Sequence, residues 1–104
     1  MMRDTNRDDV GLDMTISCER LAQRLRSRGA THPVAAAVAL VARGHRGVDT
    51  EPFAAAIGID ARSLRAVEAG AVAFADLPDE IAIAFAEVPS ANLFLIADFE
   101  RGMK

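Results

Sequence analysis

Two arginines in one short helical stretch are the residues whose type and spacing most clearly indicate chemistry. Arg62 and Arg65 lie three positions apart in the segment ARSLRAVEA, residues 61–69. On an α-helix that spacing places both guanidinium groups on one side. A guanidinium group can contact a phosphate or donate two hydrogen bonds to a guanine edge, and the Ser63 hydroxyl can donate to a phosphate. The pattern therefore indicates a surface suited to nucleic acid.

Other residues with catalytic or metal-binding potential are poorly arranged for such roles. His32 and His45 have no second ligand three or four positions away, as a metal site on one helix would need. Cys18 falls on an apolar helical stripe with no histidine nearby to activate it, which indicates a core residue. Asp79 and Glu80 are adjacent, so they suit the positive start of a helix better than paired acid–base chemistry. We expect no catalytic site, no metal and no cofactor.

Two short helices joined by a tight turn must position the arginines. Asp49 or Thr50 can cap the first helix, TEPFAAAIG, and Asp60 can cap the second, which Gly70 ends. Gly58 supplies the backbone freedom that a sharp turn between them needs. Helices below roughly 12 residues are marginal in water, so these two must pack on each other.

The side chains of the second helix divide between an inner and an outer face. Leu64 and Val67 are predicted to face inward, while Ile59 fills the corner after the turn. The outward positions are Arg62, Arg65, Ala66 and Ala69.

The segment TEPFAAAIGIDARSLRAVEAG, residues 50–70, resembles the helix-turn-helix of the XRE-type, lambda-repressor-like DNA-binding family. The flanking stretches VARG and DLPDEIAIAFAEV match the family's neighbouring helices in position, so the resemblance spans residues 34–88. It implies contact with double-stranded DNA and a structural role for Glu68, paired with an arginine such as Arg43. The matching residues are Phe53, Ala54, Ile57, Gly58, Ile59, Leu64, Val67, Glu68 and Gly70, and the residues it places at DNA are Thr50, Ala61, Arg62, Ser63, Arg65 and Ala66.

The rest of the chain also predicts helices. Residues 17–29, 31–44, 76–88 and 90–102 carry start and stop signals, with Ser90 as a cap and Gly44 and Gly102 as stops. Residues 34–42 are apolar all round, which is typical of a helix in the middle of a bundle. Alanine, leucine, arginine and glutamate favour helix, and aromatic residues make up only 5% of the chain. We expect an all-α fold: a compact bundle of five to six short helices containing a lambda-repressor-like helix-turn-helix.

Charge is unevenly distributed along the chain. Residues 1–13 hold two arginines and four aspartates without apolar periodicity, which predicts a disordered tail before a single helical domain at 14–104. The net charge is −3 and the pI about 5.3. Residues 14–74, however, carry eight arginines against five acidic residues, a net charge of +3. No apolar run resembles a membrane span or a secretory signal, so we expect a soluble cytoplasmic protein without membrane contact.

Two questions about partners stay open at this level. The segment 91–99 has more apolar residues than one helix face needs, so it either closes the core or pairs two copies; we favour a homodimer. For function, the favoured hypothesis is a small sequence-specific transcriptional regulator that binds duplex DNA. The alternative is a helix-turn-helix fold that binds a protein, as an antitoxin-like or adaptor module, which the acidic pI and the outward alanines favour.

Overall fold

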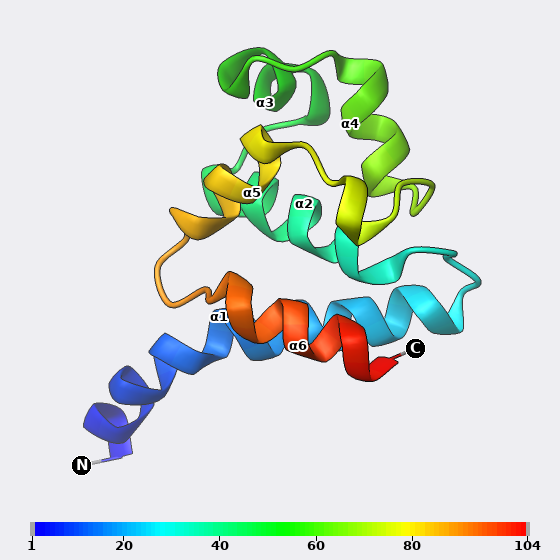
Figure 1. Cartoon of the computed structure of the whole chain (residues 1–104). Helices are drawn as coiled ribbons and strands as arrows, with labels where there is room; N and C mark the ends of the chain where they lie inside the picture. The colour runs from blue at the N-terminus through cyan, green and yellow to red at the C-terminus, as the bar shows by residue number, and fades with distance from the viewer. Residues whose placement is uncertain (1, 104) are drawn as a thin grey trace.

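Every element of secondary structure in the described part of the chain is helical. The computed structural model describes the backbone of residues 2–103 and the side chains of residues 14–103. Over this range the chain forms six α-helices, one short 3-10 turn and no strand, which confirms the predicted all-α class (Figure 1). The elements are α1 Met2–Ser27, α2 Pro33–Arg46, α3 Thr50–Ile57, α4 Ala61–Glu68, η1 Phe74–Asp76, α5 Asp79–Ala86 and α6 Leu93–Met103.

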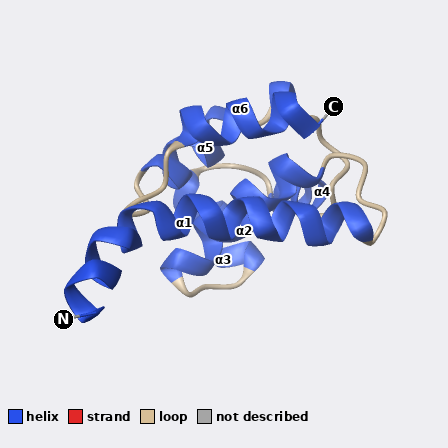
Figure 2. Cartoon of the chain, turned by 90° about the horizontal axis from the view of Figure 1, so that it is seen from below, coloured by secondary structure: helices blue, strands red, loops and turns tan. Residues whose placement is uncertain are grey.

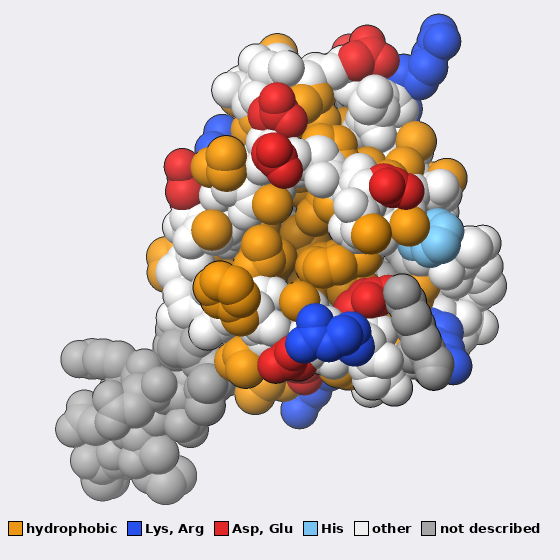
Figure 3. Space-filling view, viewed as in Figure 1, with side chains coloured by type: hydrophobic (Ala, Val, Ile, Leu, Met, Phe, Trp, Pro, Cys, Tyr) orange, Lys and Arg blue, Asp and Glu red, His pale blue; other side chains and the backbone are white. Residues whose placement is uncertain are grey.

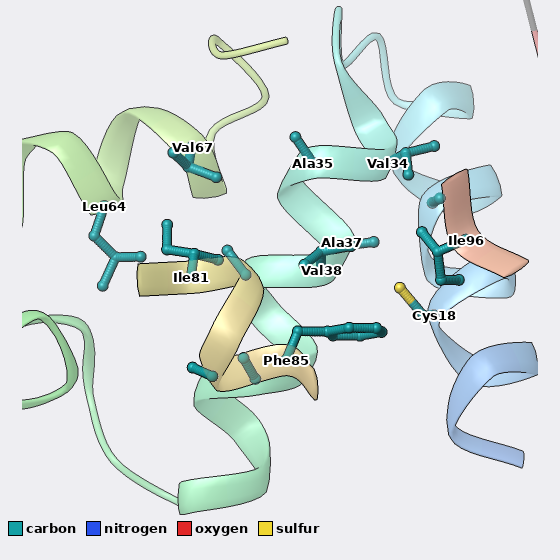
Figure 4. Close-up of a cluster of buried hydrophobic side chains, with 14 of the residues drawn as sticks. Cys18, Val34, Ala35, Ala37, Val38, Leu64, Val67, Ile81, Phe85 and Ile96 are labelled. Atoms are coloured by element: carbon teal, nitrogen blue, oxygen red, sulfur yellow. The ribbon is translucent and has the colours of Figure 1, made fainter. Parts of the chain in front are cut away.

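The core is arranged around α2. Residues 34–39 of this helix, VAAAVA, are all buried, and Ala42 is buried after them. In Figures 1 and 4, α1 lies on one side of α2, and α4 and α5 lie on the other. The distance between packed helices depends on the side chains at their contact, so alanines allow a close approach. The apolar run at 34–42 therefore forms the middle of the bundle, as predicted.

Larger side chains complete the core on both sides of α2. Figure 4 shows Leu64 and Val67 of α4 with Ile81 of α5 on one side, and Ile96 of α6 on the other. The ring of Phe85, from α5, points across toward α1. All five side chains are almost completely buried. Each contributes roughly 1.5–3 kcal/mol to stability through burial.

Cys18 is part of this core. Its side chain is fully buried, and it faces the ring of Phe85 in Figure 4. Burial, followed by the nearby Glu19 carboxylate, raises the pKa of the Cys18 thiol to about 12. The thiol therefore stays protonated at neutral pH and serves as a small apolar side chain, as the sequence predicts.

Two helices continue past the glycines that were predicted to end them. α2 runs through Gly44 to Arg46, and α6 runs through Gly102 to Met103. Glycine lowers helix propensity without forcing a stop, so the neighbouring residues decide where the helix ends. α2 ends at Gly47, which has a φ of 68° and whose N–H donates to the Arg43 carbonyl at 3.1 Å. Gly47 provides the left-handed residue that closes the helix.

The start of α6 also differs from the prediction. Asn92, rather than Ser90, caps the helix, because its Oδ1 accepts a hydrogen bond from the Leu95 N–H at 3.1 Å. Ser90 has a φ of 73° and lies in the loop before it. The buried Thr15 hydroxyl of α1 donates to the Ser90 carbonyl at 3.3 Å and accepts from the Asn92 N–H at 3.0 Å. These contacts attach α6 beside α1 (Figure 2).

The beginning of α1 lies upstream of its predicted start. The sequence predicts helix from Ser17, whereas the backbone of α1 is helical from Met2. The predicted tail, residues 1–13, lies outside the residues whose side chains the structure describes. Among the described helices, none combines the length and apolar character that a membrane span would require.

A matched pair of phenylalanines tests the core. We expect Phe85→Ala to lower the free energy of unfolding by about 3–5 kcal/mol, because the ring is fully buried. Phe94→Ala removes the same ring from a position that is 86% exposed and should change the stability of the monomer by less than about 0.5 kcal/mol. Urea denaturation followed by circular dichroism measures both values. Equal losses would contradict this assignment of buried and exposed rings.

Candidate functional site

A sharp turn joins the two helices that carry the predicted site. α3 ends at Ile57, α4 begins at Ala61, and Gly58 between them has a φ of 82°. The N–H groups of Gly58 and Ile59 both donate to the Ala54 carbonyl, at 2.9 and 3.0 Å. A left-handed residue is needed for this geometry, and glycine adopts it without steric cost. The turn therefore stops α3 within one residue and starts α4 soon afterwards.

The inner faces of α3 and α4 are anchored in the core. Phe53 and Ala54 of α3 are buried, as are Leu64 and Val67 of α4. Both helices contact α2, and they contact each other. The rotation of α4 about its axis is consequently fixed by packing, as the spacing of Leu64 and Val67 predicts.

A hydrogen-bonded ion pair reinforces the position of α4. Arg43 Nε of α2 donates to Glu68 Oε2 at 2.7 Å, and the Thr50 hydroxyl of α3 donates to Glu68 Oε1 at 3.1 Å. Arg43 Nη1 also donates to the Val48 carbonyl at 3.0 Å. The side chains of Arg43 and Glu68 are only 25% and 12% exposed. The expected pairing of Glu68 with Arg43 is confirmed, and it links three helices through one carboxylate.

The outward face of α4 gathers most of the predicted site residues. Arg62, Ser63 and Arg65 are exposed and Ala66 is half-buried beside them, whereas half-buried Ala61 packs against the core. The sixth predicted residue, Thr50, is half-buried, and its hydroxyl points to Glu68 rather than to solvent. Five of the six predicted residues therefore lie on α4. Thr50 lies on α3, and its hydroxyl is hydrogen-bonded to Glu68.

The two arginines of α4 have different surroundings. Arg62 forms no ion pair with any side chain in the described part of the chain. Arg65 Nη2 forms an ion pair with Glu51 Oε2, and both side chains are exposed. Sequence inspection did not identify this pair, because Glu51 belongs to α3 and lies fourteen positions before Arg65. A carboxylate therefore lies on the face where the sequence predicts phosphate contact.

A shallow hollow of about 450 Å³ lies beside this ion pair at the start of α3. Its lining mixes both signs of charge, so it is not a uniformly positive surface. The lining residues are Arg43, Asp49, Thr50, Glu51, Pro52 and Arg65.

The remaining positive charge of residues 14–74 is divided between two places. Arg46 pairs at 3.1 Å with Glu87, which directly follows α5, and lies over the ring of Phe53, with its guanidinium carbon 5.4 Å from the ring centre. The exposed arginines of α1 lie across α2 from α4 (Figures 1 and 4). The net charge of +3 in the middle of the sequence does not form one patch around α4. The α1 arginines are Arg20, Arg24, Arg26 and Arg28.

The histidines and acidic residues set aside on sequence grounds lie apart. His32 precedes the first turn of α2, His45 is exposed in its last turn, and Asp79 and Glu80 are exposed in the first turn of α5. Within the part of the chain that the structure describes, no three histidine, cysteine or acidic side chains form a group that could hold a metal ion.

Comparisons with protein-family models, with curated proteins and with solved structures found no match for this chain.

The Arg43–Glu68 pair provides a stability test. We expect Glu68→Gln to lower the free energy of unfolding by about 1–3 kcal/mol, because it leaves a partly buried guanidinium without its counter-charge. Glu51→Gln breaks the exposed pair with Arg65 and should cost less than about 0.5 kcal/mol. Chemical denaturation of both variants gives the comparison. A Glu68→Gln loss no larger than that of Glu51→Gln would contradict the structural role of Glu68.

Proposed function

We propose that this chain is a small, sequence-specific transcriptional regulator of the XRE type that presents α4 to duplex DNA. The observation that carries the proposal is the outward set Arg62, Ser63 and Arg65 on a helix whose inner face is anchored by Leu64 and Val67. A rigidly held helix with outward guanidinium groups can enter a major groove and contact phosphates and base edges. The resemblance of residues 50–70 to the lambda-repressor-like family supports the same role.

The two arginines would contribute differently to binding. Arg62 has no acidic partner among the described side chains, so its guanidinium group can approach DNA without breaking an ion pair. Arg65 would have to exchange Glu51 for a phosphate or a guanine. An exposed ion pair is worth at most about 1 kcal/mol, so this exchange is a modest cost. Glu51 and the exposed Asp60 also oppose phosphate, which limits binding to unrelated sequences.

The same surface also supports the alternative of a protein-binding module. Half-buried Ala66 and exposed Ala69 leave a small apolar surface on α4 beside the arginines. Acidic and basic side chains are mixed around it, as the pair of Arg65 with Glu51 shows. A partner protein with a matching charge pattern could pack there. A measurement of DNA binding also decides between the two functions.

A salt titration tests the DNA-binding proposal. Binding to a selected duplex and to a scrambled duplex is measured by fluorescence anisotropy for wild type, Arg62→Ala and Arg65→Ala. Loss of a guanine contact should cost roughly 1–3 kcal/mol on the selected duplex only, whereas loss of a phosphate contact should weaken both and reduce the salt slope by about one unit.

Arg24→Ala is the matched control, because Arg24 is an exposed arginine on α1, across α2 from α4. It should bind both duplexes like wild type. If the wild-type protein binds neither duplex in a salt-dependent way, the DNA proposal is wrong and a protein partner takes its place.

Homodimerisation through residues 91–99 is the second part of the proposal. Ile96 is buried, and Leu93 and Phe99 pack partly buried against the core. Phe94 and Leu95 are 86% and 44% exposed. The segment therefore both closes the core and exposes two large apolar side chains, Phe94 and Leu95, which would contact a second copy.

We expect Phe94→Asp or Leu95→Asp to give a monomer with unchanged helicity, because these substitutions place a charge in the dimer contact. Val48→Asp is the control, since Val48 is an exposed apolar residue in the loop between α2 and α3. Analytical ultracentrifugation across protein concentration reports the oligomeric state. A wild-type protein that remains monomeric at the highest concentration would overturn the dimer. Phe99→Asp would not test the dimer alone, because Phe99 contacts the core and its substitution would also destabilise the monomer.

A further inference from the structure

A hollow of about 260 Å³ opens on the face of the molecule that Figure 3 shows. Figure 3 shows hydrophobic side chains gathered at its floor. Four segments converge there: the end of α1 with the following loop, the first turn of α2, η1 and the last turns of α6. Its volume is close to the lower end of the range of roughly 300–1,000 Å³ for small-molecule sites. The lining residues are Arg26, Ala30, Thr31, His32, Pro33, Val34, Ala35, Phe74, Glu100 and Met103.

The floor of the hollow is apolar and includes a ring. Val34 and Ala35 come from α2, Phe74 from η1 and Met103 from the end of α6. Val34 and Ala35 are fully packed into the core, whereas Phe74 and Met103 are only half-buried. The exposed parts of Phe74 and Met103 therefore remain available to a ring or a short aliphatic chain, which a thioether and a phenyl ring both accommodate well.

The polar groups at the rim favour an anion. Arg26 lines the hollow and forms no ion pair with any described side chain. Thr31 also lines the hollow, and the first turn of α2 contains no acidic residue. Glu100 also lines the hollow, but it is already engaged in an interaction of its own. Arginine is suited to holding a carboxylate with two parallel hydrogen bonds.

We infer that this hollow binds a small carboxylic acid with an apolar, ring-sized body. The body lies against Phe74 and Met103, and the carboxylate is directed to Arg26. This site is separate from the outward face of α4 and does not depend on DNA binding.

The wall of the hollow is connected to the end of α4. The N–H of His32 donates to the Gly70 carbonyl at 3.0 Å, and Gly70 lies just after α4. Gly70 has a φ of 81°, and a Cβ placed on it would lie 3.1 Å from Ala30 Cβ. Ala30 and His32 both line the hollow. A ligand that contacts these residues will therefore also perturb the Gly70 backbone. The amide signal of Gly70 is then a second measure of binding.

The experiment uses three probes of similar size and different charge: benzoate, benzyl alcohol and benzylamine. Each is titrated into the chain of residues 1–104, and amide chemical shifts are followed by two-dimensional NMR. We expect saturable shifts at residues 30–35, Phe74 and Gly70, with benzoate binding more tightly than benzyl alcohol and benzylamine binding most weakly. Arg26→Gln should weaken benzoate roughly three- to tenfold and leave benzyl alcohol unchanged.

Arg24→Gln is the matched control, because Arg24 is exposed on the same helix and does not line the hollow. It should leave the affinity for benzoate as in wild type. The inference is overturned if no probe gives saturable shifts at the residues that line the hollow. It is also overturned if Arg26→Gln and Arg24→Gln change benzoate affinity equally. Neither result bears on DNA binding, which the salt titration tests separately.

Discussion

The fold depends on the close approach of backbones around α2. Residues 34–39 contribute two valines and four alanines, all buried, so little side-chain volume separates α2 from α1, α4 and α5. Small side chains also lose little rotamer freedom on folding. The larger apolar residues, such as Phe85 and Leu64, are supplied by the surrounding helices and fill the space that α2 leaves. The surrounding helices can therefore pack closely because the central helix carries the smallest buried side chains.

Electrostatics serve mainly to fix helices in place. Arg43 and Arg46 occupy the last turn of α2, where they complement the negative end of the helix and bind Glu68 of α4 and Glu87 after α5. The charges of these two arginines are therefore already paired with carboxylates of the same chain. The acidic composition leaves few arginines for an external anion, and those on α1 and α4 lie on different sides of the molecule. Any polyanion that binds at α4 meets a surface of mixed charge.

Local sequence signals predicted the features that are set by one helix or one turn. The Gly58 turn, the inward Leu64 and Val67, and the pairing of Arg43 with Glu68 were predictable from spacing or from the family resemblance. Residues that act across the fold were not predictable in this way. Asn92 caps α6 because Thr15, 77 positions earlier, holds the preceding loop. Glu51 reaches Arg65 only because the turn brings α3 and α4 together. Glycine positions were ambiguous too, since both Gly44 and Gly47 can end a helix and only the left-handed backbone at Gly47 does so.

The attachment of α6 has a consequence for how the molecule opens. α6 packs mainly against α1 and α5, its only fully buried side chain is Ile96, and the Thr15 hydroxyl holds the loop that leads into it. The contacts among α2, α3, α4 and α5 do not include it. Detaching α6 therefore leaves the packing of α3, α4 and α5 on α2 in place. Amide protons of α6 would exchange with solvent by a local opening, whereas those of α2 would require the whole bundle to unfold.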